Sequence, residues 1–465
     1  MFSEIVYHNR RNLLRNRLLN NGIILLTGNM EAPCNYEDNT YPFRQDSSFL
    51  YYFGLDIPNL AGVIDTDSGD EIIFGDRKTM QDIIWSGAEP DLEEHCKRVG
   101  IKQIRPLRSL FLYIAKAKIT GRKVHFLPPY RAATKLLLTE LLGFDNDYLT
   151  SAASLRLIQA IISMRLIKEP CEIEELKKAA ATGYDMHIIG MQMATAGTKE
   201  HEIAAAMECV AHAVGHRTSF PSIVTQHGEV LHNHPQNVSL EPNRMLLVDA
   251  GAETEMHYAS DYTRTIPVDG KFSPKAAIIY NIVLAANEEA RRLARPGATY
   301  LSVHLAVCNL IAYQLTCLGI MKGDPEEAVS RGAHALFMPH GLGHALGLDV
   351  HDMENLGQRN VGYDSNIRPS TQFGLASLRF ARTLLAGHVV TNEPGIYFIP
   401  ALIDKWSAEK RFRDFINYPK VAQFKSVGGI RLEDDLLITE QGCEVLGKRL
   451  PITRDEVIEA MADKI

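Results

Sequence analysis

MLLVDAGAETEMHYASDYTRT, residues 245–265, is the stretch that decides the fold of this chain. An apolar run stops at Asp249, and the chain then turns and returns from Tyr258 to Ile266 with a second carboxylate at Asp261. This pattern predicts a β-hairpin whose two aspartates lie side by side. Burying two like charges is costly unless a proton or a cation neutralises them. The hairpin is therefore a candidate half of a metal site, although solvated turn carboxylates explain it equally well on its own.

Three more candidate ligands follow in apolar surroundings. MPHGLGHALGLDVHD, residues 338–352, contains three histidines, and the glycines between His340 and His344 predict a loop or strand edge rather than a helix. Glu393 closes the apolar run of VVTNEPGIYF, and Glu433 interrupts the strand pattern of GGIRLEDDLLIT. A carboxylate at an inner strand position is seldom tolerated unless it is paired, which favours ligands over solvated charges.

The five donors suit a pair of divalent cations better than a single one, because four carboxylates carry more charge than one ion neutralises. Two neighbouring cations that activate a bridging water are the catalytic device of aminopeptidases and phosphatases, so peptide hydrolysis is the predicted chemistry. Oxygen and imidazole ligands admit Mn, Zn, Co and Fe, with Mn preferred here. Arg431 is predicted to orient a ligand carboxylate without binding the metal itself. The alternative is that it is a surface residue. The predicted ligands are Asp249, Asp261, His344, Glu393 and Glu433.

The composition is that of an ordinary soluble protein with two domains. The 465 residues exceed one ordinary core, and 46% hydrophobic with 23% charged residues is a globular composition. A net charge of -7 without a Lys/Arg cluster argues against nucleic acid as a partner, and no membrane span is expected. The seven scattered cysteines argue against disulfides and thiolate metal sites, which predicts a cytoplasmic location. Each cysteine is interpreted as a small buried apolar residue.

Hydrophobic periodicity and capping residues divide the chain near residue 168. Residues 1–167 alternate helix and strand patterns, as in an α/β domain, and Pro170 opens the first helix of the second domain, 168–465. The predicted helices are Tyr7–Asn20, Ser154–Leu166, one from Pro170, Ser273–Arg295 and Thr299–Leu318; the predicted strands of the first domain are Gly22–Gly28, Phe49–Phe53, Ala61–Asp65, Glu71–Gly75 and Val124–Leu127.

The order Asp, Asp, His, Glu, Glu, with DAG, SDYTRT, HGLGH, DVHD, EPGIY and GIRLEDD around the ligands, resembles the Xaa-Pro peptidases, aminopeptidase P and prolidase. FRQDSSFLYYFGLD, residues 43–56, resembles the N-terminal domain signature of the same group, so the resemblance covers nearly the whole chain. It implies an α+β protein. A pita-bread catalytic metallopeptidase domain at 168–465 would follow an α/β creatinase-like N-terminal domain at 1–167.

The resemblance also implies roles for individual residues. Asp249 would bind one metal, Asp261 and Glu433 would bridge the two, and His344 and Glu393 would bind the other, with Glu393 also polarising the nucleophile. Beyond these ligands, His232 and His351 would stabilise the carbonyl and the tetrahedral intermediate, His340 would shape the proline pocket, and Tyr397 would support the site as a substrate contact. The turn between the two aspartates is one residue longer than in the family pattern, and we expect a bulge to absorb the addition.

Dipeptidase and aminopeptidase action are both compatible with these motifs. The long segment from Tyr397 to Phe424 and Arg379, which would bind a dipeptide carboxylate, resemble prolidase features and favour Xaa-Pro dipeptides. Trp85 resembles a tryptophan that reaches the site of a partner subunit, which implies a homodimer or higher oligomer. Arg379 could instead lie on the surface and Trp85 in the core. Aminopeptidase P action on longer Xaa-Pro peptides is the alternative, followed by a non-catalytic pita-bread binding module and a metal-free creatinase-like amidinohydrolase.

Overall fold

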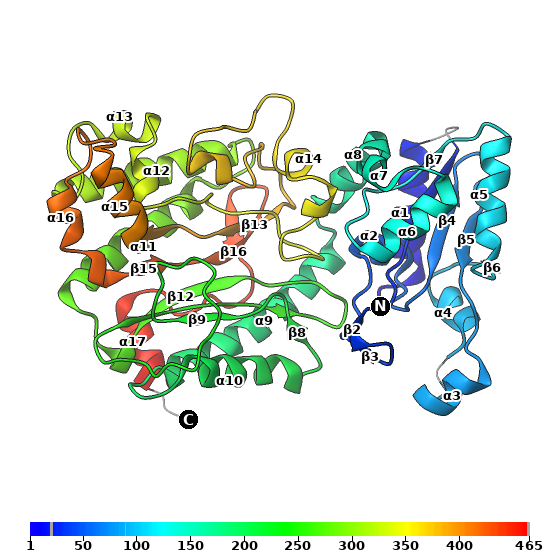
Figure 1. The fold of residues 1–465 in the computed structure, drawn as a ribbon, viewed down its shortest axis with the longest axis horizontal. Helices are drawn as coiled ribbons and strands as arrows, with labels where there is room; N and C mark the ends of the chain where they lie inside the picture. Colours follow the sequence, from blue (N-terminus) through cyan, green and yellow to red (C-terminus); the bar gives the residue numbers. More distant parts are fainter. Residues whose placement is uncertain (19–21, 89, 463–465) are drawn as a thin grey trace. The chain divides into compact units, whose positions relative to one another are not determined.

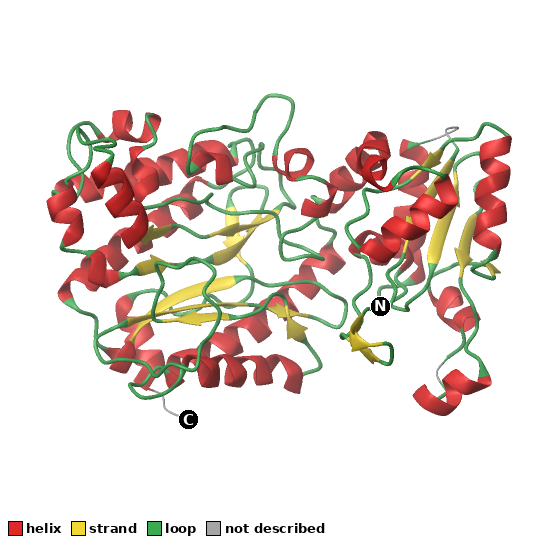
Figure 2. Cartoon of the chain, viewed as in Figure 1, coloured by secondary structure: helices red, strands yellow, loops and turns green. Residues whose placement is uncertain are grey.

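The computed structural model describes residues 1–18, 22–88 and 90–462. The chain divides into two compact units, Met1–Met164 and Arg165–Ile465. The division falls at the last turn of α8 (Leu155–Arg165), whereas the sequence pattern placed it near residue 168. In each unit, strands lie among surrounding helices (Figure 1, Figure 2).

A five-stranded mixed sheet in the order β6-β5-β4-β1-β7 forms the centre of the first unit. Its apolar side chains pack against α5, α6 and α7. The predicted pairing of Ala61–Asp65 with the following strand is confirmed as an antiparallel ladder, Ala61 opposite Phe74. The elements are α1 Glu4–Arg17, β1 Ile23–Thr27, β2 Pro33–Tyr36, β3 Asn39–Thr40, α2 Ser47–Phe53, β4 Ala61–Asp65, β5 Glu71–Phe74, α3 Met80–Ser86, α4 Leu92–Arg98, β6 Gln103–Arg105, α5 Ser109–Ile119, β7 Val124–His125, α6 Ala132–Leu142 and α7 Asn146–Ala152.

Two expectations for this unit need comment. The aromatic run Phe49–Phe53, predicted as a strand, is wrong, because it belongs to helix α2. The Asp46 side chain accepts the Phe49 N–H at the start of α2, and Gly54 ends it with φ 63°. All seven residues of α2 are buried, which removes the periodicity that separates helix from strand. The first helix begins earlier than predicted, and its expected end at Asn20 lies outside the described residues.

The second unit contains two helix pairs, each followed by antiparallel strands. Pro170 is the first helical residue of α9, and Thr299 caps α12 by accepting the Ser302 N–H, as the sequence predicts. The elements are α9 Pro170–Met193, α10 Glu200–Ala213, β8 Arg217–Thr218, β9 Ile223–Thr225, β10 Met245–Ala250, β11 Ala252–Glu253, β12 Tyr262–Pro267, η1 Val268–Gly270, α11 Pro274–Leu293, α12 Tyr300–Cys317, α13 Pro325–Ser330, η2 Ala333–Leu336, η3 Glu354–Leu356, α14 Gln358–Gly362, η4 Leu375–Ser377, β13 Val389–Asn392, β14 Gly395–Tyr397, α15 Pro400–Ala408, α16 Tyr418–Ala422, η5 Lys425–Val427, β15 Gly429–Arg431, β16 Asp434–Ile438, β17 Cys443–Val445 and α17 Arg454–Ala462.

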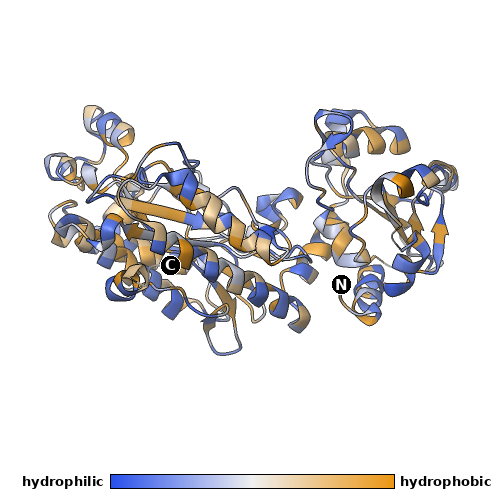
Figure 3. Cartoon of the chain, turned by 90° about the horizontal axis from the view of Figure 1, so that it is seen from below, coloured by the Kyte–Doolittle hydropathy of each residue, from blue (hydrophilic) through white to orange (hydrophobic). Residues whose placement is uncertain are grey.

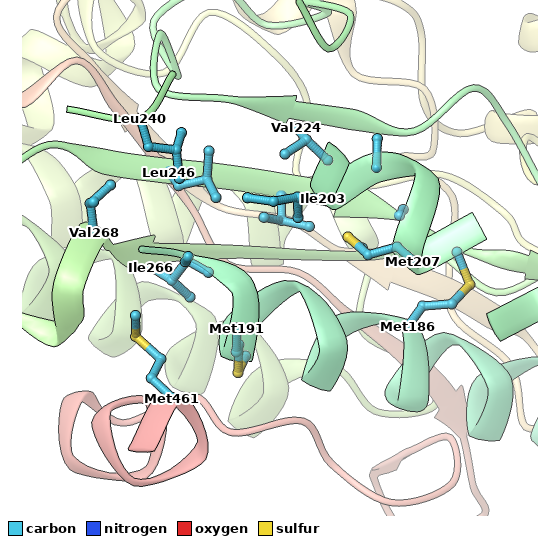
Figure 4. Close-up of a cluster of buried hydrophobic side chains, with 14 of the residues drawn as sticks. Met186, Met191, Ile203, Met207, Val224, Leu240, Leu246, Ile266, Val268 and Met461 are labelled. Carbon is cyan, nitrogen blue, oxygen red and sulfur yellow. The ribbon is translucent and has the colours of Figure 1, made fainter. Parts of the chain in front are cut away.

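The apolar faces of these helices cover the strands that carry the candidate site. α9, α10 and α17 enclose a methionine-rich core beneath β9, β10 and β12, in which Met186, Met191 and Met207 meet Val224 and Leu246 (Figure 4). Several strands are drawn in apolar colours in Figure 3, whereas the helices around them show both colours. α12 is long and apolar enough to meet the composition of a membrane span, but it packs between α11 and α13 as a core helix does.

The hairpin that the sequence predicts is present. β10 and β12 pair antiparallel with Asp249 opposite Thr263, and Asp261 immediately precedes β12. The turn between the aspartates forms a small hairpin of its own, in which Glu253 pairs with Ala259 and His257 adopts φ 67°. The β10–β12 ladder keeps an unshifted register from Met245 to Ala250, so the two aspartates lie at the same end of the hairpin.

Candidate active site

A cavity of about 680 Å³ opens in the second unit, and its wall contains most of the residues that the sequence singled out. They come from the segment 220–234, the β10–β12 hairpin, the 338–352 loop, the segment that follows η4, and the C-terminal ends of β13 and β15. Phe220, Pro221, Ile223, Leu231, Pro339, Val350 and Ala376 supply an apolar part of the wall. The polar lining includes His232, Asp249, Asp261, His340, His344, His351, Arg379, Glu393, Arg431 and Glu433.

Three of the five predicted ligands form a tight, buried cluster. One donor atom each from Asp261, His344 and Glu433 lies within 4.8 Å of the other two, and the His344 Nε2 is 3.2 Å from the Asp261 Oδ2. The His344 Nδ1–H donates to the Ala345 carbonyl at 3.0 Å, which leaves Nε2 as the lone-pair nitrogen turned toward the carboxylates. This is the arrangement that a metal-binding imidazole requires.

Asp249 lies beside this cluster, and one of its oxygens has no partner. Its Oδ2 accepts a bond from Arg431 Nη2 at 2.5 Å, whereas the buried Oδ1 finds no hydrogen-bond donor within the described residues. An ionised buried oxygen without a donor is unfavourable, so this atom is an open coordination position.

Burial, and to a smaller extent their neighbouring carboxylates, raise the pKa values of three of the candidate ligands. Burial, reinforced by the charge of Asp249, raises the pKa of Asp261 to about 8. Burial likewise raises the pKa of Glu393 to about 7, with Asp261 and Asp249 adding to the effect against His344 and Arg431. The pKa of Glu433 lies well above its ordinary value because of burial and then Asp261. Such convergence of acidic groups requires protons or cations.

Arg431 is a buried hub, which excludes the surface alternative for this residue. Its Nε donates to the Thr263 hydroxyl at 3.0 Å, its Nη1 to the Tyr397 hydroxyl at 3.0 Å and its Nη2 to Asp249. Thr263 Oγ1 in turn donates to Glu433 Oε2 at 2.7 Å. One guanidinium and one hydroxyl thereby fix the orientation of two of the candidate ligand carboxylates.

Tyr397 and His340 continue this hydrogen-bond chain. The Tyr397 side chain is fully buried, and its hydroxyl donates to His340 Nε2 at 2.9 Å, while His340 Nδ1–H donates to the Gly341 carbonyl at 2.7 Å. Burial lowers the pKa of His340 to about 4, so the ring is neutral. Tyr397, predicted as a substrate contact, is not among the residues that line the cavity; it holds His340 and Arg431 from behind. His340 offers the cavity the apolar part of its ring because both of its nitrogens are occupied.

His351 and Arg379 share a partner that the sequence reading missed. Glu354 accepts Arg379 Nη1 at 2.6 Å and lies 3.2 Å from His351 Nδ1. The His351 ring stacks on His344 with centroids 3.8 Å apart. Burial lowers the pKa values of both His351 and His232. His232, His344, His351 and Arg379 line the cavity and were named from the sequence, whereas Glu354 lies behind them and is not part of the lining.

Other structural residues of the site carried no clear signal in the sequence. Asn287 in α11 is fully buried, and its amide donates to the carbonyls of Asn392 and Leu432, next to two of the candidate ligands. The only indication in the sequence is that Asn287 is a polar residue within a predicted helix.

Trp85 belongs to α3 of the first unit and is 80% exposed, which excludes the core alternative for it.

Comparison with known proteins gives the family. The model of metallopeptidase family M24 matches residues 174–440, and that of the aminopeptidase P N-terminal domain matches residues 7–125. The chain belongs to metallopeptidase family M24. A probable Xaa-Pro aminopeptidase of Fusarium vanettenii is 30% identical over 96% of this chain and 93% of its own. The Xaa-Pro dipeptidase of Homo sapiens is 29% identical over 95% of this chain and 88% of its own.

Solved structures agree with this M24 assignment. Aminopeptidase P from E. coli with the inhibitor Pro-Leu superposes with a TM-score of 0.81 at 28% identity, over 99% of this chain and 98% of that one. The aminopeptidase PepP of Pseudomonas aeruginosa gives a TM-score of 0.82 at 26% identity with the same coverage. The predicted architecture, an N-terminal domain followed by a pita-bread catalytic domain, is confirmed.

The M24 family implies divalent metal ions, and the residues present fit them. Four convergent carboxylates, a correctly oriented imidazole and the orphaned Asp249 Oδ1 form a hard, oxygen-rich donor set. The cavity therefore contains the donors and the negative charge that a pair of divalent ions requires.

The raised pKa values predict how metal binding depends on pH. Between about pH 4 and pH 8, the carboxyl groups of Asp261 and Glu393 stay protonated in the metal-free folded protein, whereas in the unfolded chain they have lost their protons. The folded state then binds more protons, so its free energy of unfolding falls as pH rises, by up to about 1.4 kcal/mol per pH unit for each carboxyl. Divalent ions replace these protons, so the increase in Tm on adding Mn²⁺ to chelator-treated protein should be larger at pH 8 than at pH 6. A smaller increase in Tm at pH 8 than at pH 6 would contradict this prediction. The variant Glu393→Gln should reduce the difference between the two pH values.

Proposed function

We propose that this M24 protein hydrolyses Xaa-Pro peptide bonds with two divalent ions. The observation that carries the proposal is the convergence of four carboxylates and one imidazole on a single cavity. The names of the relatives, Xaa-Pro aminopeptidase and Xaa-Pro dipeptidase, support the substrate class.

The ligand assignment follows the family order. Asp249 would hold one ion, His344 with Glu393 would hold the other, and Asp261 and Glu433 would contribute to both. The cluster of Asp261, His344 and Glu433 supports the central part of this assignment, and the free Asp249 Oδ1 supports its outer part. Oxygen-rich coordination favours Mn²⁺, although Zn, Co and Fe are compatible with the same donors.

The protein groups around the ions prepare the hydrolysis. Divalent ions bound there supply a nucleophile at neutral pH and polarise the scissile carbonyl. Glu393 accepts a proton from the attacking water and returns it to the departing proline nitrogen. His232 and His351 line the cavity and stabilise the charge that develops on the carbonyl oxygen. Arg431 and Thr263 hold the carboxylates in place throughout.

The shape of the cavity suits proline. A tertiary amide offers no N–H and presents a rigid ring, which an apolar pocket can select. Phe220, Leu231 and Val350 give the wall its apolar area, and the neutral His340 ring adds to it without an unpaired donor.

Arg379 favours dipeptides over longer substrates. Its side chain is 41% exposed at the cavity, and among the described residues its one side-chain hydrogen bond is to Glu354. Arg431, in contrast, is only 5% exposed and bonds to three partners. A guanidinium with free N–H groups can bind the carboxylate that ends an Xaa-Pro dipeptide. Aminopeptidase P action on longer Xaa-Pro peptides is the second candidate, because the Fusarium vanettenii relative and the E. coli structure carry that name.

We also propose a cytoplasmic homodimer or higher homo-oligomer. The described residues contain no disulfide, which suits a reducing compartment. Fractionation of the source cells tests this location. On α3, Met80, Ile84 and Trp85 are 70%, 74% and 80% exposed, an apolar surface that a second copy would cover.

Glu393→Gln should lower kcat for Ala-Pro by about 10²–10⁴-fold, because the amide neither transfers a proton nor offers an anionic ligand. The matched control is Glu444→Gln at an exposed position of β17, which should retain activity. Activity is measured with Mn²⁺ present and after thorough chelation, which should abolish it. Unchanged turnover of Glu393→Gln or of chelated protein would exclude the proposed mechanism.

Arg379→Ala should lower kcat/KM for Ala-Pro by about 10- to 100-fold through a higher KM, the value expected for losing a charged hydrogen bond. Cleavage of Ala-Pro-Ala, whose carboxylate lies one residue further away, should change much less. Arg368→Ala, an exposed arginine outside the cavity lining, is the control. Preference of the unmodified enzyme for the tripeptide, with no effect of Arg379→Ala on the dipeptide, would favour aminopeptidase P action.

Light scattering of the purified protein should give at least twice the chain mass of 51.9 kDa. Trp85→Asp should shift the mass toward that of one chain, because it places a charge in an apolar interface. Leu112→Asp, at a position 77% exposed on α5, should leave the mass unchanged. A single-chain mass for the unmodified protein would refute the oligomer.

A further inference from the structure

A second group of metal-binding side chains lies in the interior of the catalytic unit, among residues that the proposed mechanism does not use. His304 and Cys308 stand one turn apart on α12, and His334 belongs to η2, which packs against that helix. The three side chains belong to residues that are 0%, 1% and 2% exposed. One donor atom from each lies within 4.8 Å of the other two.

Hydrogen bonding within the described residues leaves this cluster largely unsatisfied. The Cys308 Sγ is 3.5 Å from His304 Nε2, a contact that a thiol–imidazole hydrogen bond would explain. His304 Nδ1 has no hydrogen-bond partner in the described part of the chain, and the Val329 carbonyl can serve as acceptor for at most one nitrogen of His334. Buried polar nitrogens are normally paired, so two adjacent buried rings that each keep an unpaired nitrogen indicate a ligand for lone pairs.

The spacing fits donors that share one ion. Bonds of the usual metal–sulfur and metal–imidazole lengths at tetrahedral to trigonal angles place sulfur and nitrogen about 3.5 to 3.8 Å apart. The observed separation of Cys308 Sγ and His304 Nε2 lies at the lower end of that range. Both rings are neutral and have lone pairs to offer, because burial lowers the pKa of His304 to about 3 and that of His334 to about 4.

The charge of the surroundings selects the kind of ion. Burial is the largest cause of all three pKa shifts, and the ionisable groups that add to it are histidines, His334 and His340, acting on His304. The Val329 carbonyl opposes the shift of the His334 pKa. A Cys308 thiolate would therefore be the sole negative charge of the donor set. A monovalent ion gives a neutral buried site, whereas a divalent ion leaves an unbalanced charge in a medium that disfavours it.

We propose that His304, Cys308 and His334 form a buried three-coordinate site for Cu⁺. One thiolate and two imidazoles are ligands that this soft ion accepts. On binding, the Cys308 thiol proton leaves to solvent and a copper–sulfur bond replaces the sulfur–hydrogen bond, with no change of oxidation state. The prediction from sequence that the cysteines are buried apolar residues without a metal role is thus revised for Cys308, and it is wrong for Cys34, Cys209 and Cys317, which are exposed. The inference does not depend on the proposed peptidase activity.

The test compares two cysteines of the same helix. Full-length protein and the variants Cys308→Ala and Cys317→Ala are produced in copper-supplemented cells and then incubated with Cu⁺ under anaerobic conditions. Excess metal is removed with a Cu⁺ chelator, and copper is counted by mass spectrometry. The unmodified protein and Cys317→Ala should retain about one copper per chain, and Cys308→Ala at least 10-fold less. X-ray absorption at the copper edge should show one sulfur and two nitrogen neighbours.

Folding of the variants is checked independently. Cys308→Ala should keep the Mn²⁺-dependent hydrolytic activity and the circular dichroism of the unmodified protein, and His334→Gln provides a second loss of copper from a different element. Equal copper in Cys308→Ala and Cys317→Ala, no copper in the unmodified protein, or a coordination sphere without sulfur would overturn the proposal. Retention of Zn²⁺ in preference to Cu⁺, when both are offered at equal concentration, would overturn the assignment to a monovalent ion.

Discussion

The site depends on the balance between four mutually repelling carboxylates, three of them buried and the fourth, Glu393, partly exposed, and the Arg431 guanidinium that is buried beside them. Asp249, Asp261, Glu393 and Glu433 face one cavity, and Arg431 contacts one of them directly and a second through Thr263. One positive charge cannot balance four negative ones, so the remainder must be met by protons or by metal ions. Burial, reinforced by the neighbouring carboxylates, raises the pKa of three of these groups. The fold holds a site that is electrostatically incomplete without cations.

Such a site needs a rigid frame, because the carboxylates would otherwise turn away from one another. The frame joins segments more than 160 residues apart in sequence. The Thr265 hydroxyl donates to the Arg431 carbonyl and accepts the Arg431 N–H, and the Glu433 N–H donates to the Thr263 carbonyl. Asp435 accepts the backbone N–H of Asp261. These bonds fasten β12 to the chain from β15 to β16, so the orientation of one ligand strand determines that of the other.

The loop with the histidines is fixed by a different interaction. Asp352, only 1% exposed, receives Arg165 Nη2 at 2.7 Å and Lys168 Nζ at 3.0 Å. Burial opposes ionisation of Asp352, but Lys168 and Arg165 outweigh it and lower the pKa of this carboxyl. Breaking such a buried pair by removal of one partner costs about 3–5 kcal/mol. The start of the catalytic unit is thereby bonded to the 338–352 loop. This loop carries His344 and His351, whose rings stack on each other.

The features that could be predicted from the sequence are those encoded within a few neighbouring residues. The β10–β12 hairpin, the Pro170 start of α9 and the Thr299 cap of α12 are encoded within a few residues, and the structure has all three. The α2 helix was missed because its run of buried aromatics has no polar face, although Asp46 and Gly54 mark its ends. Asn287, Glu354 and the partners of Arg431 could not be identified in advance, because their roles exist only once distant segments meet.

The same locality explains why one cluster was expected and the other was not. Hard oxygen ligands draw attention in a sequence, since a carboxylate inside an apolar run contradicts its surroundings. His304 and Cys308 sit on an apolar helix where a histidine and a cysteine read as ordinary core residues, and His334 comes from a separate turn. The missing hydrogen-bond partners of their nitrogens can be recognised only in the folded structure. Because oxygen-rich and sulfur-containing donor sets prefer different ions, the two clusters can coexist in one unit without competing for the same metal.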